Sequence, residues 1–151
     1  MGTLKKFKYG NRSLEILSTC HVDMQKIAQL AIFWSAVDVS LIEGYRTPER
    51  QQALFKRGLT KIDGIHKKGK HNYKPSLALD FCAYIPGMRA RAYDKTHLAY
   101  IAGIFSAAAA YLLNKGEISH RLRWGANWDQ DGVLVFDQNF LDMPHVELVP
   151  I

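Results

Sequence analysis

Cysteine is scarce in this chain of 151 residues, which contains only Cys20 and Cys82 and no CxxC pair. A disulfide framework needs more cysteines, and a cysteine-based zinc site needs them at closer spacing, so both are excluded. We expect two reduced and buried thiols.

Long apolar runs are also missing. The N-terminal sequence contains no apolar stretch of signal-peptide length, and Lys6 stands where the myristoylation pattern needs Ser or Thr. The longest apolar run, 101–113, is shorter than the roughly 20 residues that span a bilayer. The sequence therefore predicts synthesis in the cytoplasm without a targeting signal, and no membrane insertion.

No repeat, low-complexity segment or linker interrupts the chain, which predicts a single domain over 1–151 with no separate cell-wall-binding domain. The net charge is +6 and its positive residues are spread out. This favours a solvated basic surface, or attraction to a polyanion such as nucleic acid, anionic lipid or an anionic cell wall. Charge alone does not choose among these partners.

Hydrophobic periodicity and turn residues divide the chain into seven elements. Three helices are predicted, at 22–36, at 48–57 and at 94–114. Four segments are predicted to be extended, at 37–45, 76–85, 121–128 and 144–149. This order favours an α+β fold in which a small, mostly antiparallel sheet packs with helices.

One aspartate lies within a predicted strand whose other residues are mostly apolar and are expected to be buried. Alternation in 76–85 places Leu79 and Phe81 on one face, toward a core, and Asp80 on the other. A half-buried carboxylate is costly unless it is paired or bound to a metal. The neighbours of Asp80 on its face, Ala78 and Cys82, are small and leave room for a bulkier group. An ion pair with an arginine and a metal site are both open explanations.

The C-terminal segment FLDMPHVELV carries a similar set of side chains. His145 and Glu147 share one face of the last strand, and Asp142 stands on the turn leading in. Together with His71, nine positions before Asp80, two histidines and one aspartate could supply three protein ligands. Three ligands that leave a fourth position open are typical of catalytic zinc. The chain has no HExxH, which excludes a zincin helix.

These residues resemble the first motif of the M15 peptidases, SxHxxGxAxD. That family includes the VanY- and VanX-like D,D-peptidases and the phage-type L-alanyl-D-glutamate endopeptidases. His71, Ala78 and Asp80 match the motif, whereas Gly69 replaces its Ser, Ser76 replaces its Gly, and two residues are inserted in the turn before the strand.

Two further motifs follow the same family pattern. The segment 142–148 is similar to its E/DxxH motif, which ends in an HVEL-like sequence, and EGYRTPERQQALF is similar to its GYR(S/T)xxxQ segment, with Arg46 and Gln51 at the matching positions. The three motifs occur in order over about 20–149. The insertion in the first motif leaves His66 as an alternative to His71.

The resemblance implies the M15, hedgehog-like D,D-peptidase fold with a zinc site in a cleft. It implies one Zn²⁺ held by His71, Asp80 and His145. It further implies Asp142 as the general base, which takes a proton from water and returns it to the leaving amine. Glu147, two residues after His145 on the same strand face, is the alternative base or a supporting residue.

Arg46 and Gln51 are the expected substrate-binding residues. A guanidinium can hold a substrate carboxylate or stabilise an oxyanion, and an ordinary ion pair with a nearby glutamate is the alternative. Trp128 and Tyr45 are candidates for lining the cleft, or for the core. A Ca²⁺ site is a further candidate, although its carboxylates lack EF-hand spacing: Asp129, Asp131 and Asp137.

The resemblance is strongest to phage endolysins. It implies a zinc-dependent peptidoglycan hydrolase that cleaves the L-Ala–D-Glu bond of the stem peptide and lyses the host. Such an enzyme is made in the host cytoplasm, leaves through a holin pore and acts on the anionic cell envelope. We expect a monomer that does not bind nucleic acid. A D-Ala-D-Ala carboxypeptidase of the same family and an inactive cell-wall or polyanion-binding module are the alternatives.

Overall fold

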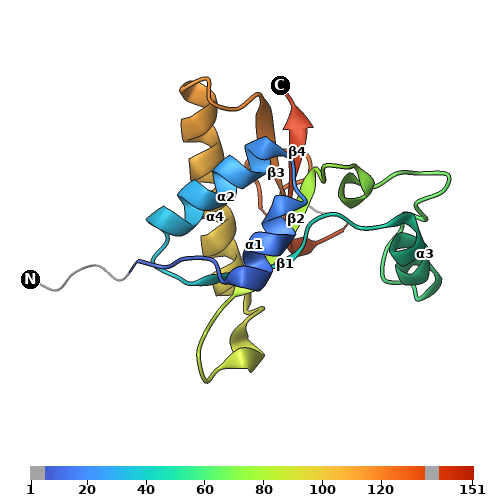
Figure 1. The fold of residues 1–151 in the computed structure, drawn as a ribbon, viewed down its shortest axis with the longest axis horizontal. Coiled ribbons are helices and arrows are strands. Elements are labelled where there is room, and N and C mark those ends of the chain that lie inside the picture. The colour runs from blue at the N-terminus through green and yellow to red at the C-terminus, as the bar shows by residue number, and fades with distance from the viewer. Residues whose placement is uncertain (1–5, 135–139) are drawn as a thin grey trace, which may run out of the picture.

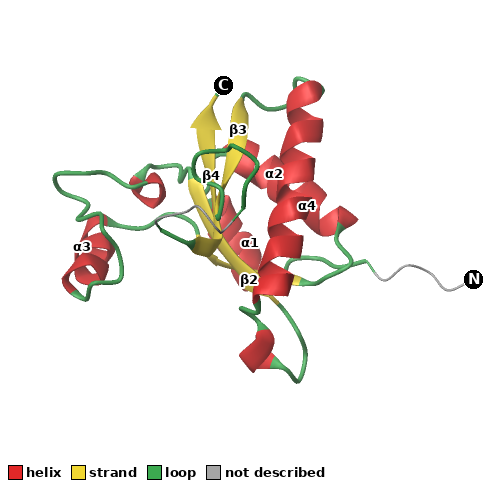
Figure 2. Ribbon diagram, turned by 180° about the vertical axis from the view of Figure 1, so that it is seen from behind, coloured by secondary structure: helices red, strands yellow, loops and turns green. Residues whose placement is uncertain are grey.

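The computed structural model describes residues 6–134 and 140–151. Within them, four strands form one sheet in the order β1-β2-β4-β3, and every neighbouring pair is antiparallel (Figures 1 and 2). The strands are β1 (Val39–Glu43), β2 (Ala78–Ala83), β3 (His120–Gly125) and β4 (Asp142–Pro150). The helices are α1 (Asn11–Ser18), α2 (Val22–Trp34), α3 (Pro48–Lys56) and α4 (Lys95–Asn114), with short 3₁₀ turns at Lys70–Asn72 and Arg89–Arg91.

This architecture confirms the predicted α+β fold and adds a helix that the sequence did not indicate. Helix α1 is amphipathic, but it is only eight residues long, shorter than the roughly 11–18 residues over which a helical period is judged. It packs beside β1, where the Ser13 hydroxyl accepts the Leu41 N–H at 3.0 Å. The helix therefore covers part of an otherwise open sheet edge.

Helices α2 and α4 cover one face of the sheet and enclose the core (Figures 1 and 2). Leu79 and Phe81 point into it from β2, and the Phe81 ring stacks on Phe105 of α4 with centroids 5.5 Å apart. Asp80, between them, points away from these helices, as the alternation predicted. One face of β2 thus belongs to the core, and the other is free to carry a site.

Helix α4 confirms the helix predicted at 94–114 and begins before the apolar run 101–113. With 20 residues and a mean hydropathy of 1.5 in its most apolar window, it is long and apolar enough to cross a membrane by length and composition alone. Leu98, Ile101 and Phe105 are nevertheless buried against the sheet and α2. These contacts are those of a core helix.

Helix α3 stands on the far side of the sheet from α2 and α4, and the segment after it forms a long loop (Figures 1 and 2). As predicted, the helix begins at Pro48, and the Thr47 hydroxyl caps it by accepting the Arg50 N–H at 3.2 Å. Gly58, with φ of 70°, follows its end. The loop returns through Lys70–Asn72 to β2, so it brings side chains toward the outer face of the sheet.

The pairing of each outer strand with its neighbour is irregular next to that face. In β1, Leu41 pairs with Phe81 and Glu43 pairs with Asp80, so one extra residue bulges out. The register of β3 and β4 shifts between Trp124 and Gly125. Bulges of this kind redirect side chains, and here both of them adjoin the site described next.

Candidate active site

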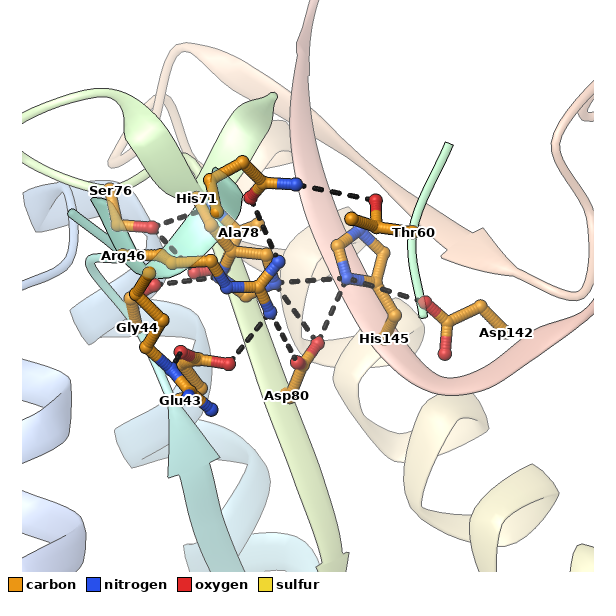
Figure 3. A network of polar contacts seen from close by, with 12 residues as sticks. Glu43, Gly44, Arg46, Thr60, His71, Ser76, Ala78, Asp80, Asp142 and His145 are labelled. Atoms are coloured by element: carbon orange, nitrogen blue, oxygen red, sulfur yellow. Dashed lines mark hydrogen bonds and ion pairs between the residues drawn. The ribbon is translucent and has the colours of Figure 1, made fainter. Parts of the chain in front are cut away.

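Three donor atoms from separate elements meet on the outer face of the sheet. His71 lies in the 3₁₀ turn before β2, Asp80 in the middle of β2 and His145 in β4 (Figure 3). Asp80 Oδ1 lies 3.1 Å from His71 Nε2 and 2.9 Å from His145 Nδ1, and the two ring nitrogens are 3.3 Å apart. The direct pairing of Asp80 with His145 across β2 and β4 creates much of this convergence.

This donor set fits a divalent transition metal. Two ligands of a tetrahedral zinc ion are each about 2.0–2.1 Å from the metal, and therefore about 3.3–3.4 Å from each other. The three distances between His71, Asp80 and His145 approach that spacing, and two imidazoles with one carboxylate are a common catalytic zinc set. The cluster is thus a candidate metal centre, and among the described residues it offers three protein ligands, the number typical of a catalytic zinc site.

Each histidine is oriented by a hydrogen bond on its other ring nitrogen. His71 Nδ1 lies 2.6 Å from the Gly44 carbonyl oxygen, which makes Nδ1 the donor and leaves the Nε2 lone pair facing the cluster. A Cβ on Gly44 would lie 2.8 Å from the Ile16 carbonyl oxygen, so glycine lets the chain approach this closely. Such outer contacts fix the tautomer of a metal-binding histidine.

His145 is held in the same way by a carboxylate. His145 Nε2 lies 3.0 Å from Glu147 Oε1, and Glu147 Oε2 accepts a 2.8 Å bond from Arg123, directly across on β3. Burial would lower the pKa of His145, but its hydrogen bonds to Asp80 and Glu147 outweigh burial and raise the pKa to about 9. The proton on Nδ1 must therefore leave when a metal binds.

Asp80 is kept in its charged form. Burial would raise the pKa of its carboxyl, but His71 and His145 beside it outweigh burial and hold the pKa well below the usual range. An ionised carboxylate is the form that ligates a metal. The sequence left open an arginine pair as the reason for this buried aspartate, and the structure also supplies that contact, since Arg46 Nη2 lies 3.7 Å from Asp80 Oδ2.

Asp142 lies at the edge of the cluster. Its Oδ2 is 4.0 Å from His145 Nδ1, beyond the spacing of the three donor atoms (Figure 3). Burial raises the pKa of Asp142 above its ordinary value. A carboxylate with a raised pKa beside a metal centre is suited to accept a proton.

A bulge explains how Asp142 and His145 reach the same side. Residues three apart on a regular strand point to opposite faces. Here Trp124 pairs with Val146 while Gly125 pairs with Asp142, so the intervening residues of β4 bulge outward. A Cβ on Gly125 would fall on the Asp142 carbonyl group, so this close approach requires glycine.

Arg46 lies between β1 and α3, and its side chain is held by one residue from each of them. Its guanidinium pairs with Glu43 at 2.6 Å and donates to Gln51 at 3.1 Å. Gln51 is buried and also donates to the Ile62 carbonyl oxygen at 2.8 Å, which ties α3 to the following loop. Of the two expected substrate-binding residues, Arg46 thus faces the cluster while Gln51 supports it.

These residues line a cleft of about 680 Å³, one wall of which is the loop 59–70. Trp128 also lines it, with its ring 5.6 Å from the His145 ring. Tyr45 lies outside the set of described residues that line this cleft, and its ring faces the Lys74 ammonium group. His66, the alternative first ligand, is 88% exposed and contacts Asp63 instead of the cluster.

The candidate Ca²⁺ segment is described only in part. Asp131 accepts the Val133 N–H at 2.7 Å, and Asp129 accepts the Asp131 N–H at 3.5 Å. Asp137 lies outside the described residues. The described carboxylates thus cap turns of the backbone, and a calcium ion there stays a prediction.

A second group with the same residue types lies elsewhere: His21, Asp23 and His120. His21 Nδ1 accepts the Asp23 N–H at 3.0 Å as the N-cap of α2. Asp23 Oδ2 accepts bonds from Ser119 N–H at 2.9 Å and lies 2.7 Å from His120 Nδ1. These contacts join the start of α2 to the start of β3.

Sequence reasoning did not single out Gly44 or Arg123. Gly44 acts through a main-chain carbonyl group, which no side-chain motif reveals. Arg123 faces Glu147 only through the register of β3 and β4. Two opposite charges on paired strands are a recognisable signal, but only once that pairing is known.

Comparisons with known proteins agree with this geometry. The sequence profile of the phage L-alanyl-D-glutamate peptidases matches residues 5–149. The L-alanyl-D-glutamate peptidase of Escherichia phage T5 is 28% identical over 145 residues, covering 95% of this chain and 98% of that protein. The crystal structure of the Serratia marcescens L-Ala D-Glu endopeptidase ChiX superposes with a TM-score of 0.70 at 24% identity, covering 94% of this chain and 90% of that one, and so shares its fold. The chain belongs to the family of phage L-alanyl-D-glutamate peptidases.

Proposed function

We propose that this protein is a zinc-dependent endopeptidase that hydrolyses the L-Ala–D-Glu bond of the peptidoglycan stem peptide. The observation that carries the proposal is the meeting of His71, Asp80 and His145 donor atoms within 3.3 Å of one another in a cleft. The family match indicates which peptide bond is cleaved, the one between L-Ala and D-Glu. The charged Asp80, the oriented histidines and the set of three protein ligands support a catalytic metal over a structural one.

His71, Asp80 and His145 would hold the zinc ion, which would supply Lewis acidity that lowers the pKa of water toward about 7 and polarises a carbonyl group. Asp142 takes the proton of the attacking water and later delivers it to the leaving amine of D-glutamate. Glu147 is already bonded to His145 and Arg123, so it supports the ligand rather than acting as the base. Arg46 would stabilise the developing oxyanion, although its guanidinium also forms the ion pair with a nearby glutamate, Glu43, that was the alternative explanation for it.

Turnover of purified peptidoglycan tests this function. The protein is assayed as purified, after chelation and after Zn²⁺ is restored, and the released ends are identified by mass spectrometry. We expect cleavage that is lost on chelation and regained with Zn²⁺, with new L-Ala carboxyl and D-Glu amino ends. Release of free D-Ala would instead identify a carboxypeptidase. No cleavage by folded, zinc-loaded protein would contradict the enzymatic function.

In the phage life cycle this activity corresponds to an endolysin that reaches the wall only after the membrane is opened. The similarity to the phage T5 peptidase supports this role. Expression in the bacterial cytoplasm should leave cells intact until a holin or a permeabilising agent is supplied, and culture turbidity should then fall. Lysis on expression alone would contradict the dependence on release.

A further inference from the structure

The cations that line the cleft fall into two groups. Four of them are already engaged with protein groups: Arg46, Arg50, Arg123 and Lys70. Three others come from the loop 59–70, and among the described residues none of them has a carboxylate partner: Lys61, Lys67 and Lys68. We call these three residues the lysine wall.

The backbone that carries the lysine wall is fixed in place. Asp63 Oδ1 accepts the N–H groups of Ile65, His66 and Lys67 at 2.9, 2.9 and 3.1 Å. The buried Gln51 holds the Ile62 carbonyl group at 2.8 Å. A solvated lysine loop needs no such anchoring, whereas a binding surface gains from being ordered before the ligand arrives.

Aromatic contacts connect the lysine wall to the reaction centre. The Lys61 ammonium group lies 5.5 Å from the centre of the Phe140 ring, and Phe140 stacks with Trp128 at 6.3 Å. Trp128 in turn lies 5.6 Å from the His145 ring. This series crosses the cleft from the loop to a metal-binding side chain, so the wall faces the same space as the cluster.

The carboxylates on the floor of the cleft are paired with cations, whereas the lysine wall is not paired with carboxylates. Glu43, Asp80 and Glu147 lie beside Arg46, Arg50 and Arg123. The ammonium groups of Lys61 and Lys68 contact only aromatic rings among the contacts described, those of Phe140 and Tyr73. Placing like charges near each other on a fixed loop destabilises the protein slightly. An anionic ligand would relieve that repulsion, so the lysine wall is the part of the cleft lining where a carboxylate would find cations not already paired with one.

We propose that the lysine wall is the subsite for the free carboxylate of the D-glutamate residue, on the leaving-group side of the scissile bond. The inference rests on the function proposed above and adds a specificity to it. D-Glutamate has two carboxyl groups, and whichever one continues the peptide chain, the other stays free and negative. The enzyme should therefore prefer stem peptides in which this carboxylate is free over peptides in which it is an amide.

Two synthetic stem peptides that differ only in this group test the proposal, one with the carboxylate and one with the amide. They are assayed with the wild-type protein, with the K61Q/K67Q/K68Q variant and with K6Q/K95Q/K115Q. The last variant removes the same charge from exposed lysines that do not line the cleft. Product-peptide binding to each protein is titrated in parallel, so that recognition is measured without turnover.

For the carboxylate peptide we expect a rise in KM of about tenfold in the wall variant, with little change in kcat, and almost no change in the control variant. For the amide peptide the wall variant should match the wild type. The wild-type KM for the carboxylate peptide should also rise with salt. An equal loss on both peptides, or no loss on either, would overturn the subsite. If the wild type cleaves neither peptide, the proposed function fails, and the binding titration still decides whether the wall recognises the carboxylate.

Discussion

Two groups of side chains in this protein each consist of two histidines and one aspartate, and they differ in what the lone pairs of these residues contact. In the cleft, His71, Asp80 and His145 direct three donor atoms at one another within 3.3 Å. At the start of α2, Asp23 Oδ2 lies 2.7 Å from His120 Nδ1, and Asp23 Oδ1 lies 4.0 Å from His21 Nδ1. The composition of a cluster is therefore a weaker guide to a metal than the direction of its lone pairs.

In the cleft, the outward-facing nitrogens take the hydrogen bonds. His71 Nδ1 is bonded to the Gly44 carbonyl group and His145 Nε2 to Glu147, so the inward-facing nitrogens are left for a shared ligand. Without a metal, the inward nitrogen of His145 bonds to Asp80, and loss of its proton would leave three inward donors for a cation.

In the second group, the same atoms are used by the protein itself. His21 Nδ1 accepts a main-chain N–H, and Asp23 Oδ2 accepts from Ser119 and contacts His120. This group caps a helix and ties it to a strand. The comparison indicates a catalytic role for one group and a structural role for the other.

The sharpest way to test the comparison is to remove one histidine from each group. His145→Ala should abolish stoichiometric metal binding and lower activity to that of the chelated enzyme. His120→Ala should keep one metal per chain and most of the activity, but lose about 1–3 kcal/mol of unfolding free energy because Asp23 loses a partner. Metal analysis, peptidoglycan turnover and urea unfolding measure the three effects. Loss of the metal in His120→Ala would show that the second group also binds it.

Asp142→Asn should produce the next largest effect. An amide cannot accept the proton of water, so kcat should fall about 10²–10⁴-fold with metal content unchanged. The base works only when ionised, and burial raises the pKa of Asp142. The activity of the wild type should therefore fall as pH is lowered through the pKa of Asp142 in the metal-loaded enzyme, where the bound cation opposes the effect of burial. A variant that keeps this acid limb, or loses its metal, would contradict the role of Asp142 as base.

Replacing the carboxylate that supports His145 should have a moderate effect on the metal. Glu147→Gln weakens the hydrogen bond that orients the ring, and we expect metal affinity to fall about 10–100-fold. Arg123→Gln, which frees the far oxygen of Glu147, should act in the same direction. Asp23→Asn makes the same chemical change in the second group and should leave affinity unaltered. Competition with a chromophoric chelator measures the metal affinity of all three variants. Equal affinities in Glu147→Gln and the wild type would show that Glu147 does not support the metal-binding histidine.

Much of this site could be predicted because its residues are tied to strand alternation and local motifs. Asp80 was identified as anomalous from its strand alone, and the pairing of Leu79 and Phe81 with the core is as expected. His145 and Glu147 share a face because they are two residues apart. The resemblance to M15 endopeptidases is confirmed by the family match.

What the sequence could not supply depends on register and on main-chain atoms. The bulge opposite Gly125 places Asp142 beside His145, although strand alternation would separate them. Strand β4 consequently begins at Asp142, where a turn had been expected, and β3 ends at Gly125. Helix α1 was not predicted because its eight residues are too few for a helical period to be recognised. Long-range register is set by the whole sheet, so local patterns do not contain it.

The smallest expected effect concerns the pH dependence of stability in the second group. Burial would raise the pKa of Asp23, but its bonds to His120 and to the Ser119 N–H outweigh burial and lower the pKa. A carboxyl whose pKa is lower in the folded state stabilises the protein above the unfolded pKa of about 3.9, and that stabilisation is lost as pH falls through the folded pKa. Asp23→Asn should therefore be less stable than the wild type by about 1–3 kcal/mol at pH 7.

The difference between the two proteins should shrink below about pH 4, because the wild-type carboxyl then becomes protonated as well. Urea unfolding of both metal-free proteins at several pH values measures this difference in unfolding free energy. The residues of the cleft titrate equally in both proteins, so their contribution cancels in the difference. Glu147→Gln provides the matched change in the cleft. A gap between wild type and Asp23→Asn that stays constant from pH 7 to pH 3 would mean that Asp23 stabilises the start of α2 by packing rather than by its charge, and the contrast between the two groups would then rest on the metal alone.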